Sequence, residues 1–129
     1  MASTQFKTII TATLSVKNWD QAFDFYKRAF GARELYQVPG GGVGQLAVED
    51  AEFWVAEEST EHQNFSPQTL GWCSVRMLLI VADPAAMCDR AVAAGATLVV
   101  AVADNYGWRL GRIVDPFGHH WEIGRPIGY

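Results

Sequence analysis

The side chains best suited to chemistry lie close together near the end of the chain, in the string HHWEI that holds His119, His120 and Glu122. Adjacent residues of a strand point to opposite faces, so His119 and His120 cannot both bind one ion, and only His120 shares a face with Glu122. The third histidine, His62, lies in a polar segment and approaches them only if that segment folds over the same face. We therefore expect a solvated loop histidine and a histidine held in a turn, rather than a metal site built from histidines.

Two other patterns have simple interpretations. The glycines between residues 40 and 44 could be mistaken for a phosphate-binding loop, but they join strand to strand and no Lys-Ser/Thr pair follows them, so they predict a flexible hairpin or lid. The two cysteines, Cys73 and Cys88, do not make a disulfide framework, and the first residues lack the apolar core of a secretion signal. These features favour a cytoplasmic location.

The elements that position these residues follow from hydrophobic periodicity. Alternation predicts a strand over 8–16, and Asn18 followed by apolar residues at helical spacing predicts a helix over 19–30 that ends at Gly31. Asp83, followed by proline, begins a second helix that ends at Gly95. Further strands are expected at 32–38, 43–48, 52–57, 74–81, 97–102, 108–114 and 119–123, and the polar segment 58–71 is expected to be a loop.

Each half of the chain therefore runs strand, helix and three strands, which indicates an internal repeat. One constant offset carries Val16 onto Val81 and Glu57 onto Glu122. Two copies of one βαβββ unit explain this match, because each copy can bury its apolar face against the other.

Four segments resemble a known family. The strings YKRAFGA (26–32), NFSPQTLG (64–71), DRAVAAGA (89–96) and GRIVDPFGHHWEIG (111–124) are similar to the glyoxalase, bleomycin-resistance and extradiol-dioxygenase superfamily, also called vicinal oxygen chelate proteins, and within it to the PhnB-like group. The resemblance implies an α+β fold in which two βαβββ modules, about 8–58 and 72–124, are joined by a linker, 59–71, and form a curved eight-stranded sheet around a cavity. It also implies a single domain over 1–129 and a homodimer.

Metal-using members of this superfamily take ligands from the first and last strand of each module, and the resemblance carries those positions onto Thr13, Glu57, Leu78 and Glu122. Both first-strand histidines are missing, since Thr13 is a weak neutral ligand and Leu78 cannot ligate. A catalytic divalent ion generally needs three or four protein ligands. The sequence therefore predicts no metal cofactor, or at most a loosely held Mg²⁺ or Mn²⁺ on two carboxylates.

The same positions define the side chains expected to face the cavity. Glu122, against an apolar wall, is the candidate catalytic base for proton abstraction next to a carbonyl. Arg76 is expected to hold a carboxylate or phosphate of the ligand, or else to form an ion pair with Glu122 or Glu57. The predicted ligand-binding residues are Thr13, Glu57, Arg76, Leu78, Tyr106, Trp108 and His120.

The aromatic residues divide into two groups. Trp72, Tyr106 and Trp108 are expected at strand ends or loops, where they can stack on a planar ligand at the rim of the cavity. Trp54 and Trp121 fall on the opposite faces of their strands and are expected in the core, under the helices.

Composition excludes several classes of protein. With 129 residues, 50% of them hydrophobic and 19% charged, the chain is long enough for one globular domain and too apolar to be disordered. A net charge of −4 and the absence of any basic run argue against a nucleic-acid partner. No apolar stretch approaches the roughly 20 residues that a membrane helix needs.

Three functions remain open. The first is a ligand-binding protein that uses no metal, similar to bleomycin-resistance proteins, for which the acidic charge and rim aromatics suit a cationic planar molecule. The second is a lyase or isomerase with Glu122 as base, with or without a divalent metal. The third is a structural or regulatory module with a vestigial cavity. The missing histidines disfavour metal enzymology and the retained polar groups disfavour a vestigial cavity, so small-molecule binding without a metal is expected.

Overall fold

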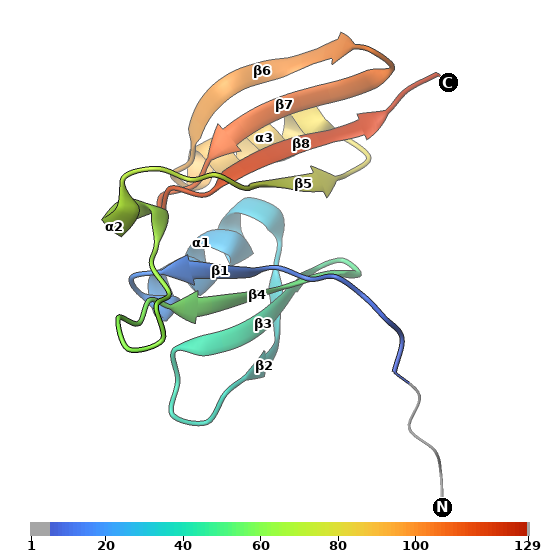
Figure 1. The fold of residues 1–129 in the computed structure, drawn as a ribbon. Coiled ribbons are helices and arrows are strands. Elements are labelled where there is room, and N and C mark those ends of the chain that lie inside the picture. Colours follow the sequence, from blue (N-terminus) through green and yellow to red (C-terminus); the bar gives the residue numbers. More distant parts are fainter. Residues whose placement is uncertain (1–5, 129) are drawn as a thin grey trace, which may run out of the picture.

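The computed structural model of the chain describes residues 6–128 and confirms two successive βαβββ modules (Figure 1). The first module consists of β1 (Thr13–Val16), α1 (Trp19–Phe30), β2 (Arg33–Gln37), β3 (Val43–Val48) and β4 (Ala51–Glu57). The second consists of β5 (Arg76–Ile80), α3 (Pro84–Ala94), β6 (Thr97–Asn105), β7 (Trp108–Val114) and β8 (His120–Pro126). The linker between them carries one short helix, α2 (Pro67–Leu70). Within the described residues, no helix has the length and apolar composition needed to span a membrane.

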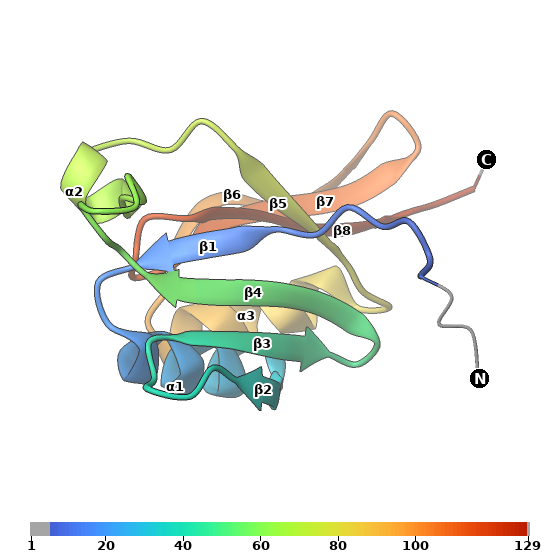
Figure 2. The same cartoon turned by 60° about the horizontal axis from the view of Figure 1, so that its bottom comes forward.

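The eight strands form two four-stranded sheets with the same topology. The strand order is β1-β4-β3-β2 in the first sheet and β5-β8-β7-β6 in the second. In each sheet the first strand of the module pairs in parallel with the last, and the other neighbours are antiparallel. In Figure 1, α3 lies behind β7 and β8, and in Figure 2 both long helices lie behind β3 and β4. One face of each sheet is therefore covered by helices, and the other face is open.

Both long helices begin and end at the residues that the sequence indicates. The side chain of Asn18 accepts a hydrogen bond from the backbone N–H of Gln21 at 2.9 Å, and α1 ends where Gly31 adopts a φ of 71°. The carboxylate of Asp83 accepts a hydrogen bond from the backbone N–H of Ala86 at 3.1 Å at the start of α3. The predicted helix over 19–30 is confirmed.

Two segments differ from the predicted elements. The strand expected over 8–16 is shorter because β4 pairs only with residues 13–16, and Ile9 and Ile10 upstream are exposed. The linker was expected to be a loop but contains α2, which forms because the hydroxyl of Ser66 accepts a hydrogen bond from the backbone N–H of Thr69 at 3.2 Å. His62 stays exposed within this linker, beside the hydroxyl of a neighbouring serine.

One hydrophobic core spans both modules. α1 contributes Phe25, Tyr26 and Phe30, none of which is more than 2% exposed. The ring of Tyr26 packs against Phe53 of β4 at 5.4 Å between ring centroids and against Trp121 of β8 at 5.7 Å. Trp121 lies in the core as predicted, and α1 thereby holds the covered faces of both sheets together.

Strand register assigns the residues of each open face, because partners on neighbouring strands point to the same side. The first open face consists of Thr13, Ser15, Tyr36, Gln45, Trp54 and Ala56. The second open face consists of Arg76, Leu78, Ile80, Leu110, Arg112, His120 and Glu122. Trp54 pairs with Thr13 and therefore faces outward, so its predicted place under the helices is wrong.

Candidate functional site

An ionic cluster lies on the second open face and consists of Arg76, Arg112, His120 and Glu122. The Nε of Arg76 donates to Oε1 of Glu122 at 3.1 Å. The Nε of Arg112 donates to Nδ1 of His120 at 3.1 Å. The four side chains meet because β8 lies between β5 and β7, which places Leu78 on one side of Glu122 and Arg112 on the other. The ion pair with Glu122 was one of the two roles predicted for Arg76, whereas Arg112 was missed because only the sheet brings it to this place.

The ionic cluster carries a net positive charge. Burial lowers the pKa of His120, and the nearby positive charge of Arg112 lowers it further. Because Arg112 donates to Nδ1, the neutral imidazole must carry its proton on Nε2. The ionic cluster then holds two guanidinium groups and one carboxylate, that of Glu122, which pairs with Arg76 and whose side chain is 25% exposed. This arrangement favours an anionic ligand, since a guanidinium can donate several hydrogen bonds to carboxylate or phosphate oxygens.

Apolar side chains surround the ionic cluster. Leu78 and Ile80 are 49% and 57% exposed. Trp108 lies on the same face, because it is four residues before Arg112 on β7 and alternate residues of a strand point to the same side. Tyr106 is fully exposed at the hairpin between β6 and β7. Of the predicted site residues, the second open face brings together Arg76, Leu78, Trp108, His120 and Glu122.

Glu57 belongs to a different part of the molecule. Its partner on β1 is the buried Val16, not Thr13. Its carboxylate accepts a hydrogen bond at 2.9 Å from the backbone N–H of Trp19, the first residue of α1. A carboxylate there satisfies a free N–H of the first helical turn and interacts favourably with the helix dipole. The expectation that Glu57 shares a cavity face with Thr13 is therefore wrong, because strand register and not distance along the chain decides which face a residue occupies.

The first-module counterpart of Glu122 is Trp54. In the second sheet Leu78 pairs with Glu122, and in the first sheet Thr13 pairs with Trp54. The four equivalent positions thus hold one carboxylate, one hydroxyl, one indole and one aliphatic side chain. Among residues 6–128, no three or more His, Cys, Asp and Glu side chains are grouped so that they could hold one metal ion. These residues do not fit the metal site of the metal-using superfamily members.

A buried carboxylate in the turn before β8 fixes where that strand begins. Oδ1 of Asp115 accepts hydrogen bonds from the backbone N–H groups of Phe117 and His119 at 3.0 and 2.9 Å. Its Oδ2 accepts from the hydroxyl of Tyr26 at 2.5 Å and from Nε1 of Trp121 at 2.9 Å. Burial and the charge of Asp115 raise the pKa of Tyr26 well above its ordinary value. The DPFG string signals this turn in the sequence, but its contact with α1 is visible only in the fold.

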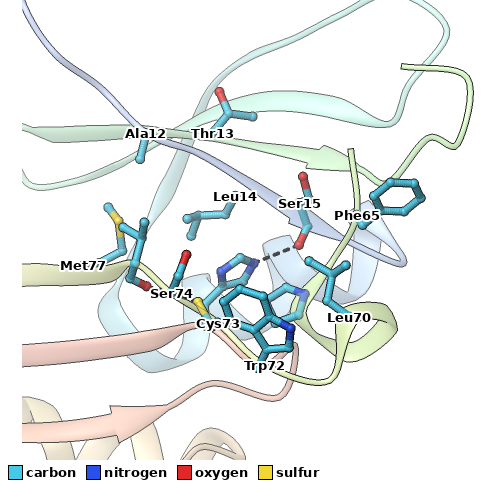
Figure 3. A pocket seen from close by; sticks show the side chains of 13 residues that line it. Ala12, Thr13, Leu14, Ser15, Phe65, Leu70, Trp72, Cys73, Ser74 and Met77 are labelled. Carbon is cyan, nitrogen blue, oxygen red and sulfur yellow. Dashed lines mark hydrogen bonds between the residues drawn. The ribbon is translucent and has the colours of Figure 1, made fainter. Parts of the chain in front are cut away.

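A pocket of about 310 Å³ lies between β1, the linker and the start of β5 (Figure 3). This linker pocket is bordered by Thr13 and Ser15 on β1 and by Leu70 and Trp72 on the linker. His119 also lines it, with Nε2 at 2.8 Å from the backbone oxygen of Ser15. Thr13 and Trp72, both expected to contact a ligand, therefore meet here and not at the ionic cluster.

Comparisons with known proteins agree with this architecture. The family model of the Glyoxalase/Bleomycin resistance protein/Dioxygenase superfamily matches residues 8–123. An uncharacterized protein of Mycobacterium bovis is 39% identical over 122 residues, which cover 88% of this chain and 80% of the relative. An uncharacterized protein of Mycobacterium tuberculosis is also 39% identical, over 88% of this chain and 72% of its own length.

Solved structures show the same fold. A gene product of Arabidopsis thaliana is 26% identical with a TM-score of 0.71, covering 94% of this chain and 100% of its own. TioX from Micromonospora sp. ML1 is 25% identical with a TM-score of 0.69, covering 93% and 100%. The fosfomycin resistance protein FosX from Listeria monocytogenes, at 16% identity and a TM-score of 0.72 over 97% and 94%, is similar in fold alone. Because the family model matches most of its length, the chain belongs to the glyoxalase/bleomycin resistance protein/dioxygenase superfamily.

Proposed function

We propose that this protein binds a small organic acid on its second open face without a metal ion. The observation that carries the proposal is the ionic cluster, in which Arg76 and Arg112 outnumber the single carboxylate of Glu122 beside a neutral His120. Exposed Leu78 and Ile80 next to these charges supply apolar contacts for the body of the ligand. The local charge favours an anion, in contrast to the cationic molecule expected from the overall acidity of the chain.

A second copy of the chain would complete this site as a cavity. Three apolar side chains of the second open face are about half exposed, namely Leu78, Ile80 and, on β6, Val100. A partner that covers them removes this surface from water and encloses the ionic cluster, which strengthens its interactions with a bound anion. A homodimer in sedimentation velocity is the expected result, and a monomer at micromolar concentration would contradict this part of the proposal. Membership of the PhnB-like group also stays a prediction.

The test compares three probes that share a phenyl ring and carry a negative, no or a positive charge: benzoate, benzyl alcohol and benzylamine, titrated calorimetrically into the intact protein. Benzoate should bind most tightly, and Arg112→Gln should weaken its binding about 10- to 100-fold, the value of one or two charge-assisted hydrogen bonds. Arg28→Gln is the matched control, because Arg28 forms an exposed ion pair with Asp24 elsewhere on the surface. Preference for benzylamine, or equal benzoate affinity in Arg112→Gln and wild type, would contradict the proposal.

A lyase or isomerase activity at the same place is the second candidate. It is favoured by the position of Glu122, which uses Oε1 in the ion pair with Arg76 while Oε2 accepts no hydrogen bond from the described residues. An oxygen in this situation can accept a proton from carbon next to a carboxylate held by Arg112. Deuterium exchange into the α-position of phenylacetate in heavy water, lost in Glu122→Gln, would support this activity. No exchange above the rate without protein would leave ligand binding as the function.

A further inference from the structure

The linker pocket is a separate cavity whose chemistry differs from that of the ionic cluster. Figure 3 shows Ala12, Leu14 and Ser15 of the segment leading through β1 on one side, with Leu70, Trp72 and Cys73 facing them from the linker. The remaining lining residues are Thr13, Phe65, Pro67, Ser74, Val75, Met77 and His119. None of the ionic-cluster residues contributes to this lining.

No formally charged carboxylate, ammonium or guanidinium group lines the linker pocket. Its only titratable ring, that of His119, already contacts the backbone oxygen of Ser15 through Nε2 at 2.8 Å. An ion placed here would lose its hydration without gaining a partner of opposite charge, at a cost of several kcal/mol. The occupant must therefore be uncharged.

Several large apolar side chains at this pocket remain in contact with water. Phe65, Leu70 and Trp72 of the linker are 37%, 50% and 65% exposed, and Val75 is 67% exposed. Together they form the side opposite β1. Aromatic rings in such a position stack on planar molecules and gain free energy from burying both surfaces.

We propose that the linker pocket binds a neutral, largely aromatic small molecule, independently of the acid bound at the ionic cluster. A volume of about 310 Å³ accommodates a molecule of two or three fused or linked rings. The ligand lies between Leu14 and Met77 on one side and Trp72 on the other. The hydroxyl of Ser74 is available to a single polar group at its edge.

Cys73 provides a built-in reporter of occupancy. Its thiol lies in the pocket wall, partly exposed, and donates a weak hydrogen bond to the backbone oxygen of Val75 at 3.1 Å. Cys88 is only 4% exposed, on the buried side of α3, and burial raises its pKa. A molecule in the linker pocket must therefore shield Cys73 from a small alkylating reagent and leave Cys88 unaffected.

The test uses N-phenyl-1-naphthylamine, an uncharged fluorophore with a naphthyl and a phenyl group on one nitrogen, whose emission rises in apolar surroundings. We expect saturable binding to wild type, slower alkylation of Cys73 by iodoacetamide in its presence, and an affinity at least about fivefold lower in Trp72→Ala and in Ser74→Asp. Both residues are exposed, so the variants should fold, which circular dichroism checks. Leu35→Ala is the control, since Leu35 is a similarly exposed apolar residue outside the pocket.

Three outcomes of the fluorophore and alkylation measurements would overturn the proposal. They are no saturable binding, binding that leaves the alkylation of Cys73 unchanged, and binding that Ser74→Asp does not weaken. Arg112→Gln separates this site from the ionic cluster, because it should reduce benzoate binding and leave the fluorophore affinity unchanged. Loss of fluorophore binding in Arg112→Gln would place the fluorophore on the second open face and would also overturn the proposal.

Discussion

The two open faces occupy equivalent positions in the two modules and carry different chemistry. Where the second face has Leu78 beside Glu122, the first has Thr13 beside Trp54. The second face gathers two arginines, a carboxylate and a histidine. The first face presents hydroxyls, an amide and the aromatic rings of Tyr36 and Trp54, which pack edge to face with 6.2 Å between ring centroids. The repeated backbone therefore preserves the geometry of the site positions without preserving the groups that a ligand meets there.

The turns between the last two strands of each module differ in the same way. In the second module Asp115 is 3% exposed and receives four hydrogen bonds, including one from α1 of the first module. In the first module the corresponding turn holds Glu49 and Asp50, both exposed. The second turn therefore joins the two modules through hydrogen bonds of its buried carboxylate, and it does so directly before β8, the strand that carries His120 and Glu122.

The largest expected effect is the loss of that contact. Asp115→Asn keeps the shape of the side chain but replaces one acceptor oxygen with an NH₂ group, which faces donors instead of acceptors. Unsatisfied buried donors should lower the free energy of unfolding by roughly 3 kcal/mol or more, measured by urea denaturation. Asp50→Asn, in the exposed turn of the first module, is the control and should change little. Equal stability of the two variants would show that Asp115 does not hold the modules together.

A smaller effect is expected from placing histidine at the two equivalent first-strand positions. Leu78→His adds an imidazole next to Glu122 and near His120, which gives three side chains on one face that can bind a metal ion. Thr13→His adds the same imidazole opposite Trp54, which cannot ligate. In chelator-stripped protein, Ni²⁺ should stabilise Leu78→His by about 1.4 kcal/mol at ten times the dissociation constant, measured by thermal unfolding.

The matched proteins decide what this result means. Wild type and Thr13→His should show no Ni²⁺-dependent change in melting temperature, because each lacks a third metal-binding side chain on the same face. A shift in Thr13→His as large as that in Leu78→His would contradict the assignment of Trp54 as the counterpart of Glu122. Glu57 would then have to be the ligand from the first module.

The elements of the fold could be predicted from the sequence because their signals are local. Asn18, Gly31 and Asp83 mark helix ends through hydrogen bonds within a few residues of themselves, and the structure has both helices there. The repeat was predictable for the same reason. The strand expected from residue 8 failed where the signal was not local, since a strand also needs a partner and the pairing register with β4 covers residues 13–16.

The site was less predictable because its residues meet across strands. Glu57 and Glu122 are related by the offset that relates the rest of the repeat, but the pairing register of the last strand differs between modules, which turns Glu57 to the covered side. Arg112 carries no local signal at all. It joins the ionic cluster because β7 pairs with β8, and nothing in the surrounding string GRIV indicates that partner.

The two glutamates give the next prediction. Glu57→Gln removes the negative charge at the first turn of α1 and should lower the free energy of unfolding by about 0.5–1 kcal/mol, while benzoate binding stays unchanged. Glu122→Gln should show the reverse pattern. It should change the affinity for benzoate and affect the free energy of unfolding less than Glu57→Gln does, since the side chain of Glu122 is partly exposed. Calorimetry and urea denaturation of both variants measure the contrast. A change of benzoate affinity in Glu57→Gln would return that residue to the site.

The smallest expected effect is the pH dependence that His120 adds to stability. Burial and the charge of Arg112 lower its pKa below the ordinary value of 6.5, so the folded protein holds the neutral ring more strongly than the unfolded chain does. As the pH falls below about 6.5, the unfolded chain takes up the proton first and the free energy of unfolding decreases until the folded-state pKa is passed. His120→Gln keeps an acceptor for Arg112 and removes this titration. Wild type should therefore lose more stability than His120→Gln between pH 7 and pH 5, in urea denaturation at each pH.

The equivalent position of the first sheet is the exposed Glu52, and Glu52→Gln should leave the wild-type slope over this range unchanged. Equal slopes in wild type and His120→Gln would mean that the imidazole is as hydrated in the fold as in the unfolded chain, and the ionic cluster would then be an open surface without the desolvation that makes its charge selective for an anion.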